Sequence, residues 1–556
     1  MTDPGATDST TQKDKAHQGA GAKAEASGAG ELYGRAGTVT FFTLLSRFLG
    51  MARDLVIANR FGAGAATDAW VQAFRIPNAL RRLTAEGSMT IAFVPVYVQA
   101  RYNLGPEGAR EFGRRVLALV LMVTLALSAL GMLLSWPLTH LFSPGFVPFP
   151  EKFQLAADLL RWSFPYLALV SLVAWAMGVL NSEGRFAAPA AAPILLNLGI
   201  IAAVLLLAGG METPIMSVAV GVLVGGVAQV LLQLRPLRAV GQSVVPLPRF
   251  NDPYLKKLFA LLAPALFGVA VYELNIIVLG IIASYLPTGQ IFHYNNATRL
   301  TEVAMGVFTF AFTTAGLPTL SEQHARKDWA AMADTLRLTF AATGYALLPA
   351  MAGLVAVGPA VVAMLYLHGA FTLADVQSTA GTLMLLALGM PAVAAVRVMV
   401  PAYYAVGDAR TPVLVSAMTL VVTGALGWWL SQSHQVYGLA AGLSLGTWFQ
   451  CVALGLRLRA RLTHLPRWLP WGAWLRQGGA AALMAAVVYP GLPLGAWHLG
   501  PGHAANWAPL ALLVLGGALV YFLTTLALRE REAYHWMALA GRLARKITGR
   551  NPGSRG

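Results

Sequence analysis

The sequence has few charged residues and almost no cysteine. Only 12% of its 556 residues are Asp, Glu, Lys or Arg, which is about half the share that is usual in soluble domains. The single cysteine, Cys451, lies in an apolar run and has no partner for an internal disulfide; such cysteines act as small apolar side chains. No cysteine or histidine cluster has the spacing of metal ligands. We therefore expect neither a metal site nor a cofactor.

Residues 1–33 contain no long apolar stretch. They are rich in Gly, Ala, Thr, Ser, Asp and Lys, a composition that cannot bury a core and is typical of disorder. A signal peptide would need an apolar core of about 7–15 residues. The sequence therefore predicts a disordered tail at residues 1–33 and no signal peptide.

Long apolar runs dominate the rest of the chain. Hydrophobic residues make up 57% of the full sequence, and the run VLALVLMVTLALSALGMLLSW (116–136) exceeds the ~20 residues that a helix needs to cross a bilayer. These runs are continuous, whereas the strands of a membrane barrel alternate between apolar and polar residues. The sequence thus predicts an all-α polytopic membrane protein.

The apolar runs divide into fourteen candidate spans, of which the second and eighth are unusually polar. The predicted spans are 36–58, 66–99, 115–141, 159–180, 187–208, 214–233, 255–286, 291–320, 336–357, 378–404, 412–431, 436–456, 477–497 and 506–528.

The distribution of Lys and Arg supports this number of spans. With the N-terminus inside, basic residues fall in the inner connections and are almost absent from outer loops such as GGMETP and SQSHQ. The inner connections hold, among others, Arg101, Arg110, Arg114, Arg115, Arg235, Arg238, Arg249, Lys256, Lys257, Arg457, Arg459, Arg461 and Arg467. Basic residues favour the cytoplasmic side. The net charge of +16 therefore indicates how the chain is oriented in the membrane and does not indicate nucleic-acid binding. We expect both termini to be cytoplasmic and the basic loops to lie near lipid headgroups.

The first two spans and the eighth carry charges that membrane helices usually avoid. Asp68, Gln72, Arg75, Ala79, Arg82 and Glu86 are spaced by three and four residues, so they form one stripe along a helix. The first span adds Arg47 and Arg53, and the eighth adds Arg299 and Glu302.

Charges at these positions need a polar environment. A charged side chain at the centre of a membrane helix costs about 2.5–3.5 kcal/mol on insertion scales, and the arginines outnumber the acids. Because the guanidinium fork suits phosphate and pyrophosphate, we expect these residues to line a cavity that holds an anion inside the membrane.

Several long motifs resemble one known family. SRFLGMARD, FGAGAATDAW, FRIPNALRRLTAEG, GVLNSEGRFAAPAAAPILLN (178–197), AMGVFTFAFTTAGLPTLSE (304–322) and AYYAVGDARTPV (402–413) are similar, in order, to segments of the MurJ (MviN) lipid II flippase family. The resemblance covers about residues 34–530. It implies the fold of the multidrug/oligosaccharidyl-lipid/polysaccharide exporter superfamily and a transporter, not an enzyme.

The resemblance also implies an organisation and a mechanism. It implies two six-helix lobes around a central cavity, at 34–235 and 236–460, two further helices at 461–530 that form a lipid groove, and cytoplasmic tails at 1–33 and 531–556. The implied substrate is lipid II, the undecaprenyl-pyrophosphate-linked peptidoglycan precursor, moved to the outer leaflet of the bacterial plasma membrane by alternating access. A monomeric transport unit and proximity to cell-wall synthesis proteins belong to the same expectation.

The substrate-binding residues of the family are carried over position by position. They fall on Arg47, Arg53, Asp68, Arg81, Arg82, Glu86 and Arg299. By this likeness Arg53, Arg82 and Arg299 hold the pyrophosphate, and Asp68 orients an arginine or pairs with it when the cavity is empty.

The chain departs from the family at one point. Some members carry a sodium site with an aspartate in the seventh span, where this chain has Leu279, and its eleventh span has no acid. A site of that type is not expected. Glu273 is an acid within the seventh span, open to two interpretations: a proton carrier, or a structural hydrogen-bond partner of Asn275.

Other functions remain as alternatives. A flippase for another undecaprenyl-pyrophosphate-linked glycan would share the arginines. A cation-coupled multidrug exporter would favour an acidic or apolar cavity, a membrane enzyme would need a catalytic constellation that the sequence lacks, and a scaffold would leave the charges within the spans without a role.

Overall fold

The computed structural model describes residues 37–84, 88–313, 316–462, 464 and 466–538. Within these ranges the regular structure is helical and contains no strand, in agreement with the predicted all-α class. A first helix covers residues 37–61 and a last one covers 531–538. The helices between them in the first half of the chain are α2 (Ala65–Thr84), α3 (Ser88–Leu133), α4 (Ser135–Phe142), η1 (Pro144–Phe146), α5 (Pro150–Ser163), α6 (Pro165–Ser182), α7 (Ala187–Leu207) and α8 (Met216–Ala239).

The second half of the chain continues with longer helices. They are α9 (Pro253–Ser284), α10 (Gln290–Thr313), α11 (Gly316–Ala325), α12 (Trp329–Tyr366), α13 (Leu373–Ala405), α14 (Arg410–Arg461), α15 (Trp471–Val488), η2 (Tyr489–Leu494), η3 (Trp497–Gly502), η4 (Ala504–Asn506) and α16 (Trp507–Ala527).

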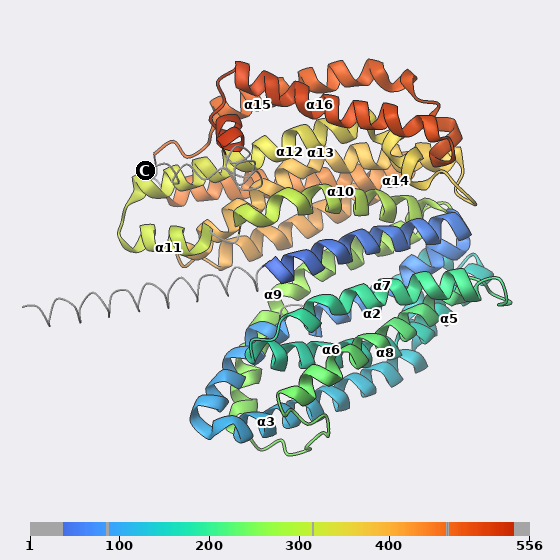
Figure 1. The fold of residues 1–556 in the computed structure, drawn as a ribbon, viewed down its shortest axis with the longest axis vertical. Helices are drawn as coiled ribbons and strands as arrows, with labels where there is room; N and C mark the ends of the chain where they lie inside the picture. Colours follow the sequence, from blue (N-terminus) through green and yellow to red (C-terminus); the bar gives the residue numbers. More distant parts are fainter. Residues whose placement is uncertain (1–36, 85–87, 314–315, 463, 465, 539–556) are drawn as a thin grey trace, which may run out of the picture.

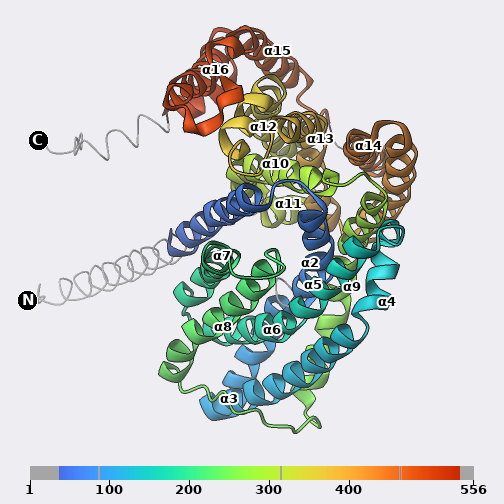
Figure 2. The ribbon, with the colours of Figure 1, turned by 90° about the vertical axis from the view of Figure 1, so that its right-hand side faces the viewer.

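These helices form two groups that lie side by side (Figure 1). Figure 2 shows α3 and α5 to α8 in one group, α10 and α12 to α16 in the other, and the first helix between them. Helix α9 packs against α3 of one group and α14 of the other. The two groups therefore meet along the first helix, α2, α9 and α10.

Eight stretches of helix are long and apolar enough to cross a membrane, among the described residues. They are Ala92–Leu133, Pro150–Ser182, Ala187–Leu207, Met216–Ala239, Trp329–Tyr366, Leu373–Ala405, Arg410–Arg461 and Ala504–Ala527. The polar helices α2 and α10 are not among them, as expected for the second and eighth predicted spans. The structure is thus a polytopic helical membrane protein.

Helices α3 and α14 are each interrupted once. Gly105 breaks α3 with a φ of 75°, and Gln435 breaks α14 with a φ of 51°. A positive φ interrupts the right-handed helix, and a residue other than glycine adopts it at some cost. Each of these two elements is therefore a pair of helical segments joined at a sharp change of direction.

Local sequence signals explain several helix starts. Pro150 and Pro165 stand in the first turns of α5 and α6, where a missing N–H costs nothing. The Asp252 side chain accepts a hydrogen bond of 2.7 Å from the Tyr254 N–H at the start of α9. The Thr372 and Asp375 side chains form a capping box at the start of α13, which satisfies free N–H groups reciprocally.

The turn between α13 and α14 is held by Asp408. Its carboxylate accepts hydrogen bonds from the Thr411 N–H (3.0 Å) and hydroxyl (2.7 Å) and lies 3.0 Å from the Arg461 guanidinium. The helix begins at Arg410, and the Asp408 carboxylate satisfies the free Thr411 N–H in its first turn. Burial raises the pKa of Asp408, but the bonds from Thr411 and the charge of Arg461 outweigh burial and hold it below its ordinary value.

Asp408→Asn is expected to lower the free energy of unfolding by up to about 1 kcal/mol at pH 7, because the asparagine oxygen can still accept the Thr411 N–H bond but the charge that pairs with the half-exposed Arg461 is lost. Because the native pKa is depressed, this contribution is fully present above the unfolded carboxyl pKa, near 4, and is lost as pH falls through the native pKa. Unfolding in detergent between pH 7 and pH 3 should show the gap between the two proteins closing in acid. A gap that stays constant would contradict the assignment, and Asp334→Asn, an exposed acid on α12, is the control.

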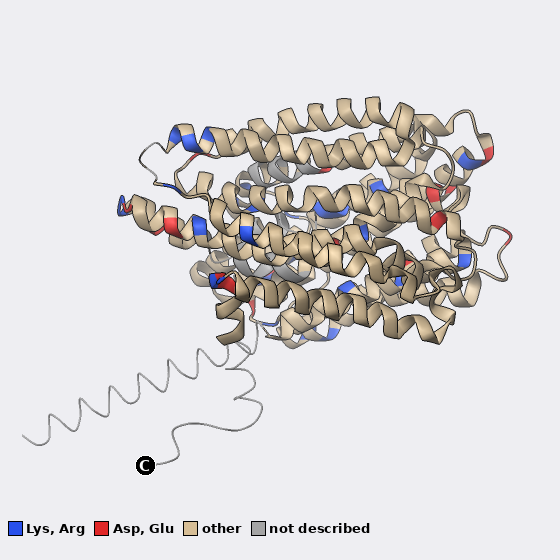
Figure 3. Ribbon diagram, turned by 90° about the horizontal axis from the view of Figure 1, so that it is seen from above, with Lys and Arg blue, Asp and Glu red and all other residues tan. Residues whose placement is uncertain are grey.

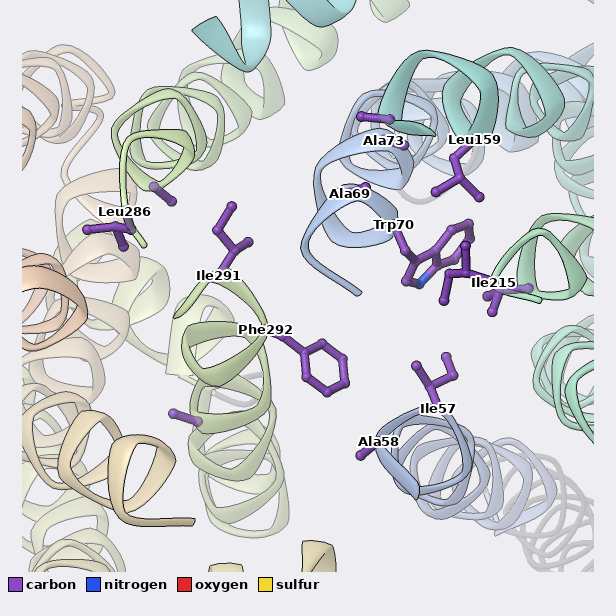
Figure 4. Packing of buried hydrophobic residues seen from close by; sticks show 14 of the residues in the cluster. Ile57, Ala58, Ala69, Trp70, Ala73, Leu159, Ile215, Leu286, Ile291 and Phe292 are labelled. Carbon is purple, nitrogen blue, oxygen red and sulfur yellow. The ribbon is translucent and has the colours of Figure 1, made fainter. Parts of the chain in front are cut away.

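One end of the bundle is closed by contacts between the two groups. Figure 4 shows Phe292 of α10 pointing toward Ile57 and Ala58 of the first helix and Trp70 of α2, and all four belong to one buried apolar cluster. Next to it, the Ala370 N–H donates a 2.8 Å hydrogen bond to the Asn59 carbonyl. We call this end, formed by 57–63, 286–292 and 367–372, the closed end.

A glycine permits the close approach of the chain at the closed end. Gly62 has a φ of 64°, and a Cβ atom at this position would lie 2.5 Å from the Ala370 carbonyl oxygen. An L side chain would be strained there and would also collide with the neighbouring backbone. The α12–α13 connection can therefore lie directly on the end of the first helix.

Candidate functional site

Charged side chains occur at both ends of the helices and also along their length (Figure 3). One of the internal charges, Asp54 of the first helix, pairs with two arginines. Its Oδ1 atom lies 2.7 Å from Arg53 Nη2, and its Oδ2 atom lies 3.5 Å from Arg299 Nε of α10. One carboxylate thus joins an arginine of the first helix to an arginine of α10.

The Arg53 guanidinium also touches the first group of helices. Its Nη1 atom donates a 3.1 Å hydrogen bond to Asn197 Oδ1 on α7, and Asn197 Nδ2 donates to the Ser46 carbonyl at 3.1 Å. Asn197 therefore fixes the position of the first helix and the direction of the Arg53 side chain together.

Arg299 is more accessible than Arg53. Its Nη1 atom donates a 2.9 Å hydrogen bond to Glu302 Oε2 on the same helix. The Arg299 side chain is 39% exposed, against 15% for Arg53, although both lie where the two groups meet. Arg299 therefore has donors that a ligand can reach.

The polar stripe predicted for the second span faces α9. Gln72 Nε2 donates a 2.8 Å hydrogen bond to the Gly280 carbonyl, and Arg82 Nη1 lies 3.3 Å from Glu273 Oε1. Between them, the Arg75 guanidinium lies against Gly280, where a Cβ atom would be 1.6 Å from Arg75 Nη1. This buried nitrogen has no hydrogen-bond partner among the described residues.

The remaining predicted site residues are placed as follows. Arg47 is exposed and its guanidinium lies against α10 at Gly306, where a Cβ atom would be 1.6 Å from Arg47 Nη1. Arg81 Nε donates a 3.0 Å hydrogen bond to Asn78 Oδ1 one turn earlier. Glu86 lies outside the described residues.

Asp68 is at the closed end and its cationic partner is a lysine. Lys152 Nζ of α5 lies 2.8 Å from Asp68 Oδ2, and the Gly289 and Phe292 N–H groups at the start of α10 donate at 2.7 and 3.0 Å. The expectation that Asp68 pairs with an arginine is therefore wrong for this conformation. Four N–H groups at a helix start have no partner within the helix and favour a negative charge, so the carboxylate joins α2 to α10.

Arginine exceeds acid where the two groups meet. Seven arginines of the described residues lie on the first helix, α2 and α10: Arg47, Arg53, Arg60, Arg75, Arg81, Arg82 and Arg299. Among the described carboxylates, Asp54, Glu273 and Glu302 lie within ion-pair distance of members of this set. Such an excess in a region of low dielectric favours an anion.

Three residues that contribute to the charged site were not among the predicted binding residues. Arg75 was part of the stripe but not one of the predicted binding residues, and its closeness to Gly280 depends on the packing of α2 against α9. Asn197 and Lys152 lie 144 and 84 residues from their partners Arg53 and Asp68, and no local sequence signal connects them.

Fold and charged interior together define a polytopic membrane protein of the transporter class. The family model described as lipid II flippase MurJ matches residues 57–500. The probable lipid II flippase MurJ of Vibrio cholerae is 33% identical over 473 residues, which cover 83% of this chain and 88% of that protein. The lipid II flippase MurJ of Burkholderia cenocepacia is 33% identical over 463 residues, 81% of this chain and 88% of that protein.

Solved structures show the same fold. A structure of lipid II flippase MurJ in an inward closed conformation superposes with a TM-score of 0.74 and 24% identity, covering 88% of this chain and 99% of that one. An inward-facing MATE family transporter of the MOP superfamily gives a TM-score of 0.64 at 13% identity, over 77% of this chain and 98% of that one; this likeness shows a shared fold. The chain belongs to the MurJ lipid II flippase family, a family of transporters and not of enzymes.

Proposed function

We propose that this protein moves lipid II from the cytoplasmic to the outer leaflet of the bacterial plasma membrane, with its arginines holding the pyrophosphate. The observation that carries the proposal is the Arg53–Asp54–Arg299 group, in which one carboxylate joins arginines of the first helix and α10. A pyrophosphate bound there would contact both helix groups at once. Family membership supports lipid II as the substrate.

The binding site in this proposal consists of Arg47, Arg53, Arg81, Arg82, Arg299 and Glu86, with Arg75 added. Arginine's planar fork binds two phosphate oxygens at once. Asp54 and Glu302 hold the guanidinium groups of Arg53 and Arg299 while no ligand is present. Asp68 acts at the closed end and not on the pyrophosphate.

Fourteen membrane crossings are consistent with the helix lengths. A straight helix of 52 residues, the length of α14, would extend about 78 Å, more than twice the ~30 Å hydrocarbon core. The predicted fourteen crossings are obtained in the following way. Helices α3 and α14 each count as two crossings. Helix α2 counts as one crossing together with the start of α3, and α5 counts as one together with α6. The lobes are then residues 34–235 and 236–460, followed by the helices of 461–530.

The sidedness follows from the basic residues. With both termini cytoplasmic, the inner connections hold the arginine clusters that the positive-inside rule requires. The closed end, at 57–63, 286–292 and 367–372, then faces outward. Alternating access requires this end to open after the headgroup binds and the opposite end to close. The protein works as a monomer, next to cell-wall synthesis proteins that use its product.

A flippase for another undecaprenyl-pyrophosphate-linked glycan is the alternative. The arginines would serve it equally well, because they contact the pyrophosphate and not the sugar. The substrate is tested by expressing the chain in a bacterium depleted of its own lipid II flippase and measuring lipid II on the outer leaflet. Restored growth and exposure of lipid II support the proposal, and their absence at normal membrane levels favours the alternative.

A further inference from the structure

Asn296 is a polar side chain in the interior of the protein that has no hydrogen-bond partner. It lies in the second turn of α10 and is fully buried. Neither its Nδ2 atom nor its Oδ1 atom has a partner among the described residues. Buried amides are nearly always paired, because an unpaired polar atom in the interior is costly. An amide with both atoms unpaired therefore indicates a partner that is not part of the chain, either water or a ligand.

Helical spacing places Asn296 on the face of α10 that meets the first helix. It follows Phe292 by four residues and precedes Arg299 by three, so the three side chains share one face. Phe292 points toward Ala58 of the first helix (Figure 4), and Arg299 pairs with Asp54, one turn earlier on that helix. Asn296 therefore lies between the closed end and the arginine that Asp54 holds.

The Tyr366 hydroxyl is a second unpaired group in this region. Tyr366 is the last residue of α12, directly before the closed-end segment 367–372, and it is fully buried. Its Oη atom has no hydrogen-bond partner in the described part of the chain. The charges of Asp54 and Arg299 act on this hydroxyl, so it lies near their ion pair. Unpaired polar atoms of α10 and α12 thus lie next to the proposed pyrophosphate site.

The unpaired atoms suit a sugar better than a phosphate. The Asn296 amide offers a donor and an acceptor, the Tyr366 hydroxyl can act as either, and neither side chain carries a charge. Sugar hydroxyl and acetamido groups also donate and accept, so they can satisfy these atoms. In a pyrophosphate-linked glycan the first sugar is joined directly to the pyrophosphate. Arginines that hold the pyrophosphate therefore bring the sugar next to Asn296 and Tyr366.

We propose that Asn296 and Tyr366 bind the sugar that is joined to the pyrophosphate, and that the sugar reaches them when the closed end opens. The inference rests on the proposed function and names the groups that contact the glycan. Both side chains are fully buried while this end is closed, so the sugar gains these bonds only after the first helix moves away from α10 and α12. A ligand shifts an equilibrium by its differential affinity for the two states. The sugar therefore favours the open state.

Ordered water is the other partner that could satisfy these atoms. Water in a closed pocket would stabilise the ligand-free protein, and truncating the polar groups would then lower its unfolding temperature. At a ligand site, an apolar side chain of similar shape leaves the ligand-free protein as stable as before or more stable. The two explanations thus predict different changes in stability.

The test compares two ligands that differ only by the sugar. Undecaprenyl pyrophosphate, alone or carrying one N-acetylglucosamine, is titrated calorimetrically into the purified full-length protein in detergent. The wild type should bind the sugar-bearing ligand more tightly. Asn296→Leu and Tyr366→Phe should each weaken its binding by about two- to tenfold, the worth of a hydrogen bond, and should bind undecaprenyl pyrophosphate as the wild type does. Their unfolding temperatures should equal or exceed that of the wild type.

The opening step is measured at Ala58, which is fully buried at the closed end. Ala58→Cys in a Cys451→Ser background is treated with a membrane-impermeant maleimide in the presence of each ligand. The sugar-bearing ligand should raise the reaction rate above that with undecaprenyl pyrophosphate, and adding Asn296→Leu should remove this difference. Equal rates with the two ligands would overturn the opening step.

Asn103→Leu is the control, because Asn103 is an exposed asparagine on α3 that donates to the Tyr254 hydroxyl; it should bind both ligands as the wild type does. Equal binding of the two ligands by the wild type would overturn the proposal, as would variants that lose both ligands equally or neither. A lower unfolding temperature with unchanged sugar affinity would assign the unpaired atoms to water and overturn it as well. If Asn296→Leu fails to fold, Tyr366→Phe, which removes a single hydroxyl, decides. A wild type that binds neither ligand and does not move lipid II would overturn the proposed function, and this inference with it.

Discussion

Arg53→Ala and Arg299→Ala are each expected to abolish translocation of lipid II in a protein that still folds. Each removes a charged hydrogen-bond donor from the proposed pyrophosphate site, and truncating one side of a buried charge pair costs about 2–5 kcal/mol of binding. The affinity should therefore fall by about 30-fold to several thousand-fold. The readout is exposure of lipid II in a bacterium depleted of its own flippase, at matched membrane levels.

Both variants should fold because Asp54 touches both arginines. Removing one arginine leaves the carboxylate paired with the other, at 2.7 Å for Arg53 or 3.5 Å for Arg299. The loss of stability should thus stay below the 3–5 kcal/mol that an uncompensated buried charge costs. Unfolding temperatures in detergent test this point separately from transport.

Two comparisons make the result specific. Arg337→Ala removes an arginine of α12 that is about half exposed and pairs with Asp334, so it should transport as the wild type does. Arg53→Lys keeps the charge but loses the fork and should retain part of the activity. Normal growth with either alanine variant would refute the arginine site, although the chain could still be a flippase.

Much of this site follows from residue spacing alone. The three- and four-residue spacing from Asp68 to Arg82 predicted one polar stripe on α2, and the structure places that stripe along α9 through Gln72 and Arg82. The regular spacing of apolar or charged residues along a helix involves only residues that are close in sequence, so it can be predicted from the sequence. The polarity of α2 and α10 was likewise predicted from composition.

The partners of the charges could not be predicted in this way. Asp54 meets Arg299 across 245 residues, and Asp68 meets Lys152 across 84. Such pairs depend on how the helices pack against one another. Composition alone allows many different pairings between the acids and bases of a chain. The family resemblance assigned Asp68 to an arginine, whereas its carboxylate lies at the start of α10 and pairs with Lys152 of α5.

Asp68→Ala is expected to open the closed end and to destabilise the protein by about 3–5 kcal/mol, the cost of removing one partner of a buried ion pair. The carboxylate is fully buried and Lys152 is 6% exposed, so the lysine would keep its charge without compensation. The Gly289 and Phe292 N–H groups at the start of α10 would lose their acceptor as well. Unfolding in detergent measures the first effect.

The second effect is measured by access to the closed end. A cysteine replacing Ala58, which is fully buried at the closed end, in a background that carries Cys451→Ser, should react faster with a membrane-impermeant maleimide in Asp68→Ala than in the parent protein. Asp158→Ala removes an acid on α5 whose side chain is 38% exposed. It should lower the free energy of unfolding by no more than about 0.5 kcal/mol and leave the maleimide rate unchanged.

Asp68→Asn separates the two tasks of this carboxylate. The asparagine oxygen can still accept one N–H bond from α10, but it carries no charge for Lys152. Because α2 packs against α5, the ion pair of Asp68 with Lys152 is expected to remain if the closed end opens, whereas the bonds to Gly289 and Phe292 on the α10 side are expected to break. Asp68→Asn should therefore lose stability like Asp68→Ala but open less. Equal maleimide rates in Asp68→Ala and the parent protein would show that the apolar cluster around Phe292 closes this end unaided.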